Sequence, residues 1–371
     1  MSGSVYGNLF RISTWGESHG KGIGVVVDGC PAGLTLTESM IQSYLNRRRP
    51  GQTKYATPRK ENDTVEILSG IFEQKTTGTP ISMVVMNTNQ QSADYSEISK
   101  YYRPGHADYT YDEKYGFRDY RGGGRSSGRE TIGRVAAGAV AMAILDQLGI
   151  HVCAYTKSIG EISIDYKSCN KENILLSPLA MPDLQASADA QALLDDKIRE
   201  MDSVGGIIEC IVSGMPAGIG EPVFDKLDAD LAKAVLSIGA VKGIEFGSGF
   251  ESAKMTGFQN NDKFQYNNSR KVSKLTNHAG GILGGISDGT EIIFRACIKP
   301  TPSIAQTQDT INKSGENIKI NIKGRHDPII VPRAVVVIEA MTAVTIVDLL
   351  FMGMTSKMDN LRKYFNPQGL L

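Results

Sequence analysis

The sequence predicts an α+β protein made of two related halves, each a small sheet with helices. Short β-branched segments alternate along the chain with segments of helical spacing. The turn Gly29-Cys30-Pro31-Ala32-Gly33 lies between a predicted strand and a predicted helix, and Gly214-Met215-Pro216-Ala217-Gly218 repeats this arrangement. A Gly-Thr pair precedes a later strand in each half, at Gly78 and Gly289. Chance similarity between the two turns stays open as an alternative.

The predicted strands are short, rich in β-branched residues and bounded by turn residues. They cover residues 24–28, 64–68, 81–86, 207–212 and 291–298. The predicted helices cover residues 37–48, 130–148 and about 225–236, with Thr37 as an N-cap and Pro50-Gly51 as a stop. Residues 259–274 and 158–185 read as exposed excursions from this framework.

The length of 371 residues allows two or three domains or a single large unit. We predict one domain over residues 1–371, with related halves at roughly 1–150 and 200–350. The formal net charge is zero, with 40 basic and 40 acidic side chains, whereas a dedicated nucleic-acid binder is usually basic. Any anion site must therefore come from local clustering of charge.

Compartment and membrane signals favour a cytoplasmic protein. Five scattered cysteines show no CxxC and no metal-ligand spacing, which is typical of reduced thiols. The start of the sequence lacks the features of a signal peptide. Residues 334–352 are strongly apolar but include Glu339 and Asp348, so we predict a buried helix and no membrane association.

Arginine clustering is the main functional clue. Arg47, Arg48 and Arg49 are consecutive, and six more arginines fall between Arg103 and Arg134. The planar guanidinium suits phosphate and carboxylate, although nearby acids could also balance these charges. The segment from Arg121 to Arg129, RGGGRSSGR, runs into a predicted helix start, where backbone N–H groups and the helix dipole attract anions. It is not a Walker A loop.

Four of the five histidines lie in polar loops beside glycine or proline. These are His19, His106, His278 and His326, whereas His151 follows a helix end in an apolar stretch and reads as structural. Histidine exchanges protons readily near neutral pH, which suggests acid–base work, while a backbone hydrogen bond remains the alternative for His278 and His326. No HxxxH or HxH pair occurs, so a metal site is disfavoured. Ser18 and His19 are adjacent but lack a GxSxG elbow, which argues against a serine hydrolase.

Long motifs in order along the chain resemble the chorismate synthase family. They are GESHG (16–20), RRRPG (47–51), RPGHADYTY (103–111), RGGGRSSGRE (121–130), SIGAVKGIEFG (237–247), NHAGGILGG (277–285), KPTPS (299–303) and GRHDP (324–328). The resemblance covers nearly the whole chain. It implies a β-α-β sandwich with an internal pseudo-two-fold repeat in a cytosolic homotetramer.

The resemblance also implies the reaction, which is an anti-1,4-elimination of phosphate from 5-enolpyruvylshikimate 3-phosphate to give chorismate. This is the last common step of the shikimate pathway to aromatic amino acids. The family needs reduced FMN without net redox change. NADPH is a candidate source of the reduction, and an external flavin reductase is the other. Substrate and FMN together bring two carboxylates and two phosphates, which fits the arginine clusters.

Site roles follow from the resemblance position by position. His19 would protonate the departing phosphate, His106 would sit by the flavin, and Asp327, with Ser18 as a relay, would take a proton from the flavin. The FMN site would comprise Arg125, Ser126, Ser127, Gly239, Ala240, Gly284, Lys299, Pro300, Thr301, Pro302, Ser303 and Arg325. Arg48, Lys54, Arg129 and Arg134 would contact the phosphate of the substrate or of NADP.

Three residues depart from the family pattern, where arginine, asparagine and serine are common. They are Lys54, Gly239 and Pro302. Two rival functions remain. A kinase or transferase with an unusual glycine-rich loop predicts tight ATP binding without flavin, and a polyanion-binding protein using Arg121–Arg134 predicts salt-dependent binding to RNA.

Overall fold

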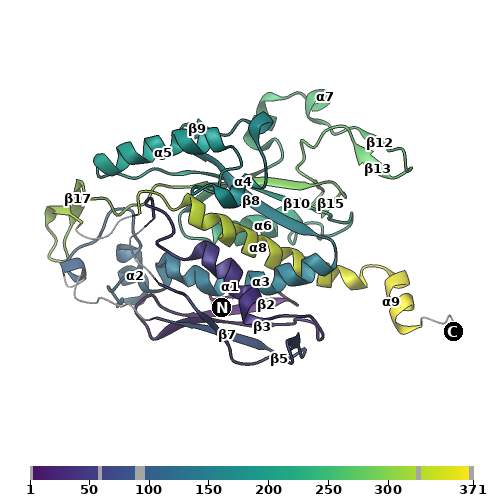
Figure 1. Ribbon diagram of the computed structural model, residues 1–371, viewed down its shortest axis with the longest axis horizontal. Helices are drawn as coiled ribbons and strands as arrows, with labels where there is room; N and C mark the ends of the chain where they lie inside the picture. Colours follow the sequence, from purple (N-terminus) through teal and green to yellow (C-terminus); the bar gives the residue numbers. More distant parts are fainter. Residues whose placement is uncertain (1–2, 57–60, 88–96, 323–326, 367–371) are drawn as a thin grey trace.

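The computed structural model describes residues 3–56, 61–87, 97–322 and 327–366. Two five-stranded antiparallel sheets enclose a layer of helices, so the predicted β-α-β sandwich is confirmed (Figure 1). The first sheet contains, in spatial order, β1 (Val5–Tyr6), β2 (Arg11–Gly16), β3 (Gly22–Asp28), β7 (Ile81–Met86) and β4 (Val65–Ile67). The second contains β9 (Ile162–Ser163), β8 (His151–Ile159), β10 (Gly206–Ser213), β16 (Ile292–Ile298) and β11 (Val241–Phe246).

The strand orders of the two sheets correspond, which is the internal repeat expected from the sequence. In the first sheet β2 and β3 are neighbours, β7 lies next to β3, and β4 forms the edge. In the second sheet β8 and β10 are neighbours, β16 lies next to β10, and β11 forms the edge. A small hairpin accompanies each sheet. The first hairpin pairs β5 (Ile71–Phe72) with β6 (Lys75–Thr76), and the second pairs β14 (Ile282–Leu283) with β15 (Ile286–Ser287). The predicted limits of the halves, near residues 150 and 200, stay a prediction.

The central layer contains α1 (Glu38–Arg48), α3 (Thr131–Gln147), α6 (Leu227–Leu236) and α8 (Val331–Met352). Thr37 caps α1, because its hydroxyl accepts a hydrogen bond from the Met40 N–H. The helices α3 and α8 touch where a Cβ on Gly138 would overlap Ala340. Small residues at that point let the two helix backbones approach closely.

Helix α8 is buried along most of its length, as the sequence predicted. By length and composition Val331–Thr355 could cross a membrane, but 83% of its most apolar window is buried inside the protein. Its two acids have partners. Glu339 accepts a hydrogen bond from the Ala154 N–H and pairs with Arg47, and Asp348 accepts from the N–H groups of residues 8, 9 and 10. These contacts satisfy carboxylates that burial would otherwise penalise.

The remaining elements decorate the sandwich. They are α2 (Asp108–Tyr115), α4 (Asn173–Leu176), α5 (Leu184–Arg199), α7 (Gly257–Asn260), α9 (Met358–Phe365), the pairs β12 (Phe264–Tyr266) with β13 (Val272–Lys274) and β17 (Thr307–Ile311) with β18 (Asn317–Asn321), and the 3₁₀ turns η2 (Glu97–Ser99), η3 (Gly124–Ser126), η4 (Gly128–Glu130), η5 (Tyr166–Ser168), η6 (Gly249–Lys254) and η7 (Gly353–Thr355).

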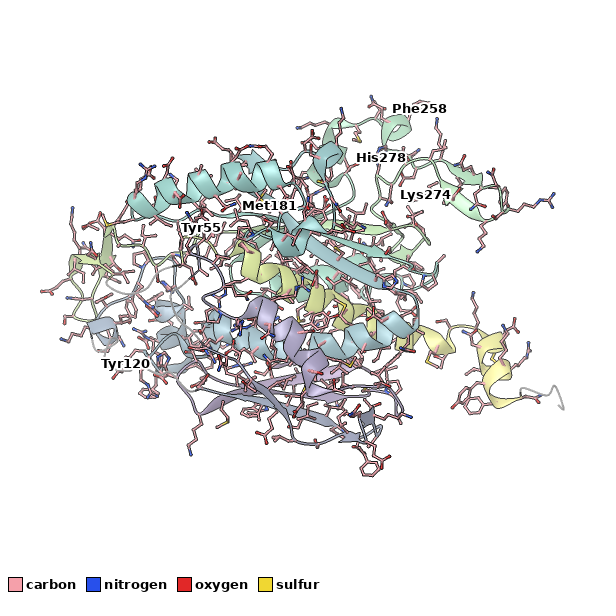
Figure 2. The ribbon with its side chains drawn as sticks, viewed as in Figure 1. Tyr55, Tyr120, Met181, Phe258, Lys274 and His278 are labelled. Carbon is pink, nitrogen blue, oxygen red and sulfur yellow. The ribbon has the colours of Figure 1, made fainter. Side chains whose placement is uncertain are left out.

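One of the two predicted excursions is corrected by the structure. Residues 259–274 are mostly exposed, as expected, and lie at the far end of the second sheet (Figure 2). Residues 158–185 are not a purely exposed segment, because Leu179 and Met181 are fully buried. The Thr156 N–H donates to the Ala180 carbonyl oxygen, which holds this segment against β8. The polar composition of this segment led to the wrong prediction, because its few apolar residues are the ones that pack into the core.

Candidate active site

Two connections that occupy equivalent places in the halves carry most of the candidate site residues. The first runs from β7 to α3 and the second from β16 to α8. They touch each other at several points. The His106 ring Nε2 lies 2.7 Å from the Ser303 hydroxyl, and the Lys299 ammonium donates to the Gly105 carbonyl oxygen at 2.8 Å. The internal repeat therefore brings His106 beside the KPTPS segment, although the two are far apart in sequence.

The loop between β2 and β3 contributes the second cluster. His19 is 5% exposed, and its Nδ1 lies 3.1 Å from the Ser18 hydroxyl, which also donates to the Gly122 carbonyl oxygen at 3.2 Å. A Cβ on Gly122 would overlap the His19 ring. Glycine at this position, with φ +61°, lets the arginine-rich loop close over the imidazole. Ser18 and His19 thus lie in hydrogen-bonding distance, which their adjacency in sequence did not predict.

Most arginines of the 103–134 cluster pair with carboxylates. Arg103, Arg118, Arg121, Arg129 and Arg134 each have at least one such partner. Burial alone would raise the pKa of Asp108, but hydrogen bonds from Arg103 and the charges of Arg103 and Arg118 outweigh it and hold this pKa below its ordinary value. These arginines therefore stabilise the loop through ion pairs as well as giving it positive charge.

Arg125 differs from the rest of this cluster. Its guanidinium donates to the Gly16 carbonyl oxygen at 3.1 Å and to the Thr14 hydroxyl at 2.7 Å, and it has no carboxylate partner in the described part of the chain. Its positive charge is therefore not neutralised by an ion pair there. Of the neighbouring hydroxyls, Ser126 donates to the Gly123 carbonyl oxygen and Ser127 accepts from the Arg129 N–H.

Arg48 and Arg129 meet at a buried carboxylate. The Asp63 side chain is 1% exposed, pairs with the Arg48 guanidinium and lies 3.2 Å from Arg129 Nη1, and Glu61 also pairs with Arg129. Asn87 accepts from Arg129 Nη2 at 2.7 Å and donates to the carbonyl oxygens of Glu17 and Gly20. This cluster anchors the His19 loop.

Sequence analysis missed Asp63, Asn87 and Arg333. Arg333, in the first turn of α8, lies 3.1 Å from an Asp327 carboxylate oxygen and donates through Nε to the Arg48 carbonyl oxygen at 3.2 Å. Asp63 has the strained φ of +46° for a non-glycine residue, which marks a constrained position. The sequence feature that could have indicated Asp63 is the polar stretch with two acids, Glu61 and Asp63, just before the strand β4.

The structure does not bring all candidate residues together. Lys54 is 63% exposed and pairs with Asp195 of α5. Arg134 pairs with Glu130 and donates to Ser237. The Ala240 carbonyl oxygen accepts from the Lys299 N–H, so Gly239 and Ala240 adjoin the start of the KPTPS segment.

Gly284 stands apart from the other described candidate residues. Gly284 lies in the β14–β15 hairpin, and β15 and β17 lie on opposite sides of the molecule in Figure 1. Arg325 and His326 lie outside the described residues. Within those residues no group of three or more His, Cys, Asp or Glu side chains could hold a metal ion.

The fold, and the arginine and histidine side chains in its glycine-rich loops, are typical of an enzyme that handles a multiply anionic small molecule. A family model described as chorismate synthase matches residues 10–351. Chorismate synthase of Lachnoclostridium phytofermentans is 72% identical over 98% of this chain and 100% of its own length, and that of Methanosarcina barkeri is 54% identical over 94% and 96%. A crystal structure of chorismate synthase matches with a TM-score of 0.76 and 30% identity, covering 98% of each chain.

This chain belongs to the chorismate synthase family, and it is a lyase with a flavin cofactor.

Proposed function

We propose that this chain converts 5-enolpyruvylshikimate 3-phosphate to chorismate by an anti-1,4-elimination of phosphate, with reduced FMN as its cofactor. The observation that carries the proposal is the buried His19 ring, held between the Ser18 hydroxyl and the Gly122 loop. A positioned imidazole is the group expected to protonate a departing phosphate near neutral pH. Burial keeps water from that proton.

His19 is the proton donor in this proposal. Its Nδ1 contacts Ser18, so the opposite nitrogen, Nε2, is the atom directed to the leaving oxygen. A hydrogen bond at one ring nitrogen fixes the orientation and tautomer of the other. Ser18 is thereby both an orienting group and a route by which a proton can reach or leave the ring.

The FMN site includes Arg125, Ser126, Ser127, Gly239, Ala240, Gly284, Arg325 and residues 299–303. Its fit to the flavin is supported by two observations. Arg125 offers a positive charge without a carboxylate partner among the described residues, as an FMN phosphate requires. The Thr301 hydroxyl oxygen is buried and finds no hydrogen-bond partner in the part of the chain that the structure describes. An unpaired buried hydroxyl is costly, and a bound ligand would satisfy it.

Reduced FMN, when bound, supplies an electron to the substrate and accepts the hydrogen lost from it. The His106 ring Nε2 lies 2.7 Å from the neighbouring Ser303 hydroxyl, and His106 would hold a bound flavin in its protonated, reduced state. Burial, followed by the nearby charge of Lys242, lowers the pKa of the Lys299 ammonium. Asp327, oriented by Arg333, would take up the proton that the bound flavin gives up after accepting the hydrogen, with Ser18 as a relay.

The substrate carries two carboxylates and a phosphate, and Arg48, Arg129 and Arg134 are the proposed contacts. Asp63 and Glu61 pair with Arg48 and Arg129. Fixed guanidinium groups in a buried cluster would stabilise charge that develops on the leaving phosphate. Lys54, which pairs with Asp195 on the surface, is the weakest member of this set, as a contact to substrate or NADP phosphate.

We infer a cytoplasmic homotetramer whose flavin is reduced either by NADPH at the same site or by an external reductase. Large exposed aromatic side chains on η6, α7 and β12 support association between copies. Phe250, Phe258 and Tyr266 are each at least three-quarters exposed. Neither nucleic acid nor a membrane is a proposed partner.

An anaerobic assay tests the proposal. Purified protein is given 5-enolpyruvylshikimate 3-phosphate and chemically reduced FMN, and chorismate absorbance and phosphate release are followed together. Equal amounts of both products, lost when the FMN is oxidised, are the expected result. Folded protein that forms neither product would refute the proposal, and ATP and RNA binding would be measured next.

A further inference from the structure

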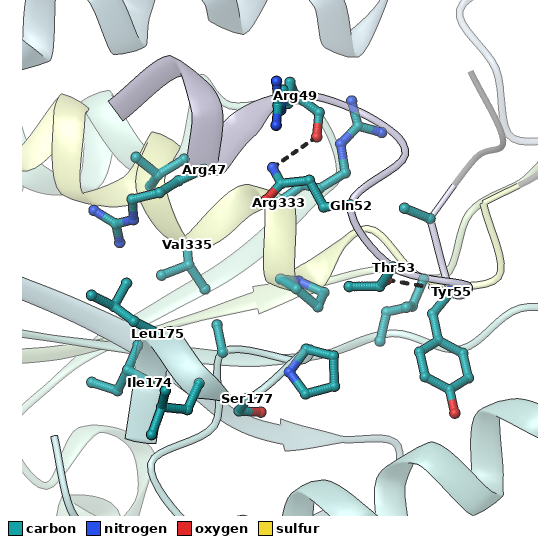
Figure 3. Close-up of a pocket in the computed structure, with 17 residues that line it drawn as sticks. Arg47, Arg49, Gln52, Thr53, Tyr55, Ile174, Leu175, Ser177, Arg333 and Val335 are labelled. Atoms are coloured by element: carbon teal, nitrogen blue, oxygen red, sulfur yellow. Dashed lines mark hydrogen bonds between the residues drawn. The ribbon is translucent and has the colours of Figure 1, made fainter. Parts of the chain in front are cut away.

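A cavity of about 360 Å³ lies beside the C-terminal end of α1 (Figure 3). Its size is within the range of small-molecule sites. Arg47 and Arg49 line one side from the end of α1, and Ile174, Leu175 and Ser177 of the α4 segment line the other. Arg333, which orients Asp327 in the proposed catalytic site, also lines this cavity. The cavity therefore adjoins the proposed catalytic site and shares that residue with it.

The charge of this cavity is positive. Three arginines line it, namely Arg47, Arg49 and Arg333, and none of the described lining residues is an aspartate or glutamate. Arg47 pairs with Glu339 at 2.7 Å and Arg333 with Asp327 at 3.1 Å, so two of the charges are balanced from outside the cavity. One positive charge remains for a ligand.

Arg49 carries that remaining charge. Its guanidinium is half-buried and makes no hydrogen bond or ion pair with any residue in the described ranges. Its backbone is fixed, because its N–H donates to the Leu45 carbonyl oxygen and its carbonyl oxygen accepts from Gln52 Nε2 at 3.1 Å. A partly desolvated guanidinium on a rigid backbone is well prepared to receive a carboxylate.

The rest of the wall is apolar. Ile329, Val335 and Val336 are almost fully buried behind the arginines, and Ile174 and Pro178 lie across from them. Such a surface favours a compact hydrocarbon body, since burying apolar area is favourable. A free inorganic anion would leave this surface unused.

We propose that this cavity binds a small amphipathic monoanion, with one carboxylate on Arg49 and a ring-sized apolar body against Val335 and Ile174, and that the bound anion competes with Asp327 for Arg333. The cavity and the catalytic site share Arg333, which also donates to the Arg48 carbonyl oxygen. A carboxylate in the cavity would draw this guanidinium from Asp327. The second part of the proposal rests on the proposed role of Asp327, whereas the first does not.

Binding is tested with 2-naphthoate, its neutral analogue 2-naphthamide, and inorganic phosphate. Calorimetry is done on the whole protein with oxidised FMN and 5-enolpyruvylshikimate 3-phosphate present, so that the catalytic site is filled without turnover. We expect naphthoate to bind with a Kd of about 1 mM or tighter, and the amide and phosphate to bind at least about 10-fold more weakly.

Variants locate the site. Arg49→Ala should weaken naphthoate about 10-fold or more, and Arg49→Lys should restore part of the loss, because a charged hydrogen-bond donor is removed and then partly replaced. Arg199→Ala is the matched control, because this arginine lies on α5 with its side chain 77% exposed. Equal binding in all variants, phosphate binding as tight as naphthoate, or binding only when the catalytic site is empty would overturn the site.

Turnover tests the competition for Arg333. Saturating naphthoate should lower kcat at least about 5-fold in the parent chain and in Arg199→Ala, and much less in Arg49→Ala. Naphthoate that binds but leaves kcat unchanged would overturn the competition. A chain with no activity under any condition would refute the proposed function instead, while the binding result would stand.

Discussion

The two halves share nearly the same hydrogen bonds at one turn, residues 29–33 in the first half and 214–218 in the second. They differ in the segments that connect their strands. In the first half the Gly33 N–H donates to the Thr76 carbonyl oxygen at 2.8 Å, and the Thr76 N–H donates to the Leu34 carbonyl oxygen at 2.9 Å. The Thr76 hydroxyl donates to the Pro31 carbonyl oxygen at 2.5 Å. In the second half the Gly218 N–H donates to the Ser287 carbonyl oxygen and the Ser287 N–H to the Ile219 carbonyl oxygen, both at 2.8 Å. The Ser287 hydroxyl donates to the Pro216 carbonyl oxygen at 2.6 Å. The Leu34 and Ile219 N–H groups donate to these hydroxyls at 3.0 and 2.9 Å.

The connections at the other end of the sheets have no such correspondence. A short loop containing Ser18 and His19 joins β2 to β3, whereas residues 160–205, with β9, α4 and α5, join β8 to β10. The repeated turn is a scaffold whose geometry is the same in both halves. The comparison teaches that the halves kept the bonds that hold each sheet and changed the segments that carry candidate chemistry.

The sharpest test of this contrast is at His19. His19→Ala should lower kcat about 10²- to 10⁴-fold with little change in unfolding midpoint, because a positioned acid is lost. Chorismate and phosphate formation are measured under anaerobic conditions. The matched variant is His151→Ala in the second half, whose side chain is 65% exposed beside Asp146. Comparable losses in both variants would contradict the assignment of the chemistry to the first-half loop.

The buried ion cluster has no match in the repeated turn, and breaking it should be costly. Asp63→Asn leaves the Arg48 and Arg129 guanidiniums with less negative charge, so the free energy of unfolding should fall by about 3–5 kcal/mol. Urea denaturation measures this change. Asp28→Asn, on the exposed Arg11–Asp28 pair, is the control and should cost no more than about 1 kcal/mol. A small effect of Asp63→Asn would mean that Glu61 alone balances the cluster.

Arg333 joins the second-half connection to the first-half helix, and its removal tests that link. Arg333→Ala should lower kcat by up to about 10²-fold, because Asp327 loses the group that orients it. Arg333→Lys should recover part of the rate, with KM changing less than kcat. If the fall in rate were fully explained by fewer folded molecules, Arg333 would have a structural role only.

The shared turn predicts equal stability losses in the two halves. Thr76→Val and Ser287→Ala each remove a buried hydroxyl that bonds twice, and each should lower the free energy of unfolding by about 1–3 kcal/mol. Urea midpoints of the two variants are compared, and kcat should stay near the parent value. Strongly unequal losses would show that the two turns are alike in geometry but not in energy.

The smallest expected effect is the pH dependence of the first-half connection. The pKa of Asp108 is held below its unfolded value of about 3.9, so its ion pairs contribute fully above that pH and are lost as pH falls through the folded pKa. Acid denaturation should shift to higher pH in Asp108→Asn. An unchanged acid transition would place the sensitive carboxylates elsewhere.

Local patterns predicted much of the framework, whereas the contacts within the candidate site depend on the tertiary fold. The strand at Ile81–Met86, the Thr37 cap and the burial of the apolar helix around Glu339 follow from spacing and capping rules, which need only neighbouring residues. The contact between His106 and Ser303 was not predictable in this way, because it requires two distant connections to fold back on each other. Asp63 was missed for the same reason, since its partner Arg48 lies at the end of α1 and its partner Arg129 in the 3₁₀ turn η4.

Helix α8 also sets the order in which the protein can become complete. All strands of both sheets precede Val331 in the sequence, yet the buried face of α8 packs against α1, α3, β8 and β10. During synthesis on a ribosome, both sheets emerge before the helix that fills the space between them. Neither half can complete its hydrophobic core before α8 has been synthesised. Both sheets therefore reach their native packing together, once α8 has left the ribosome.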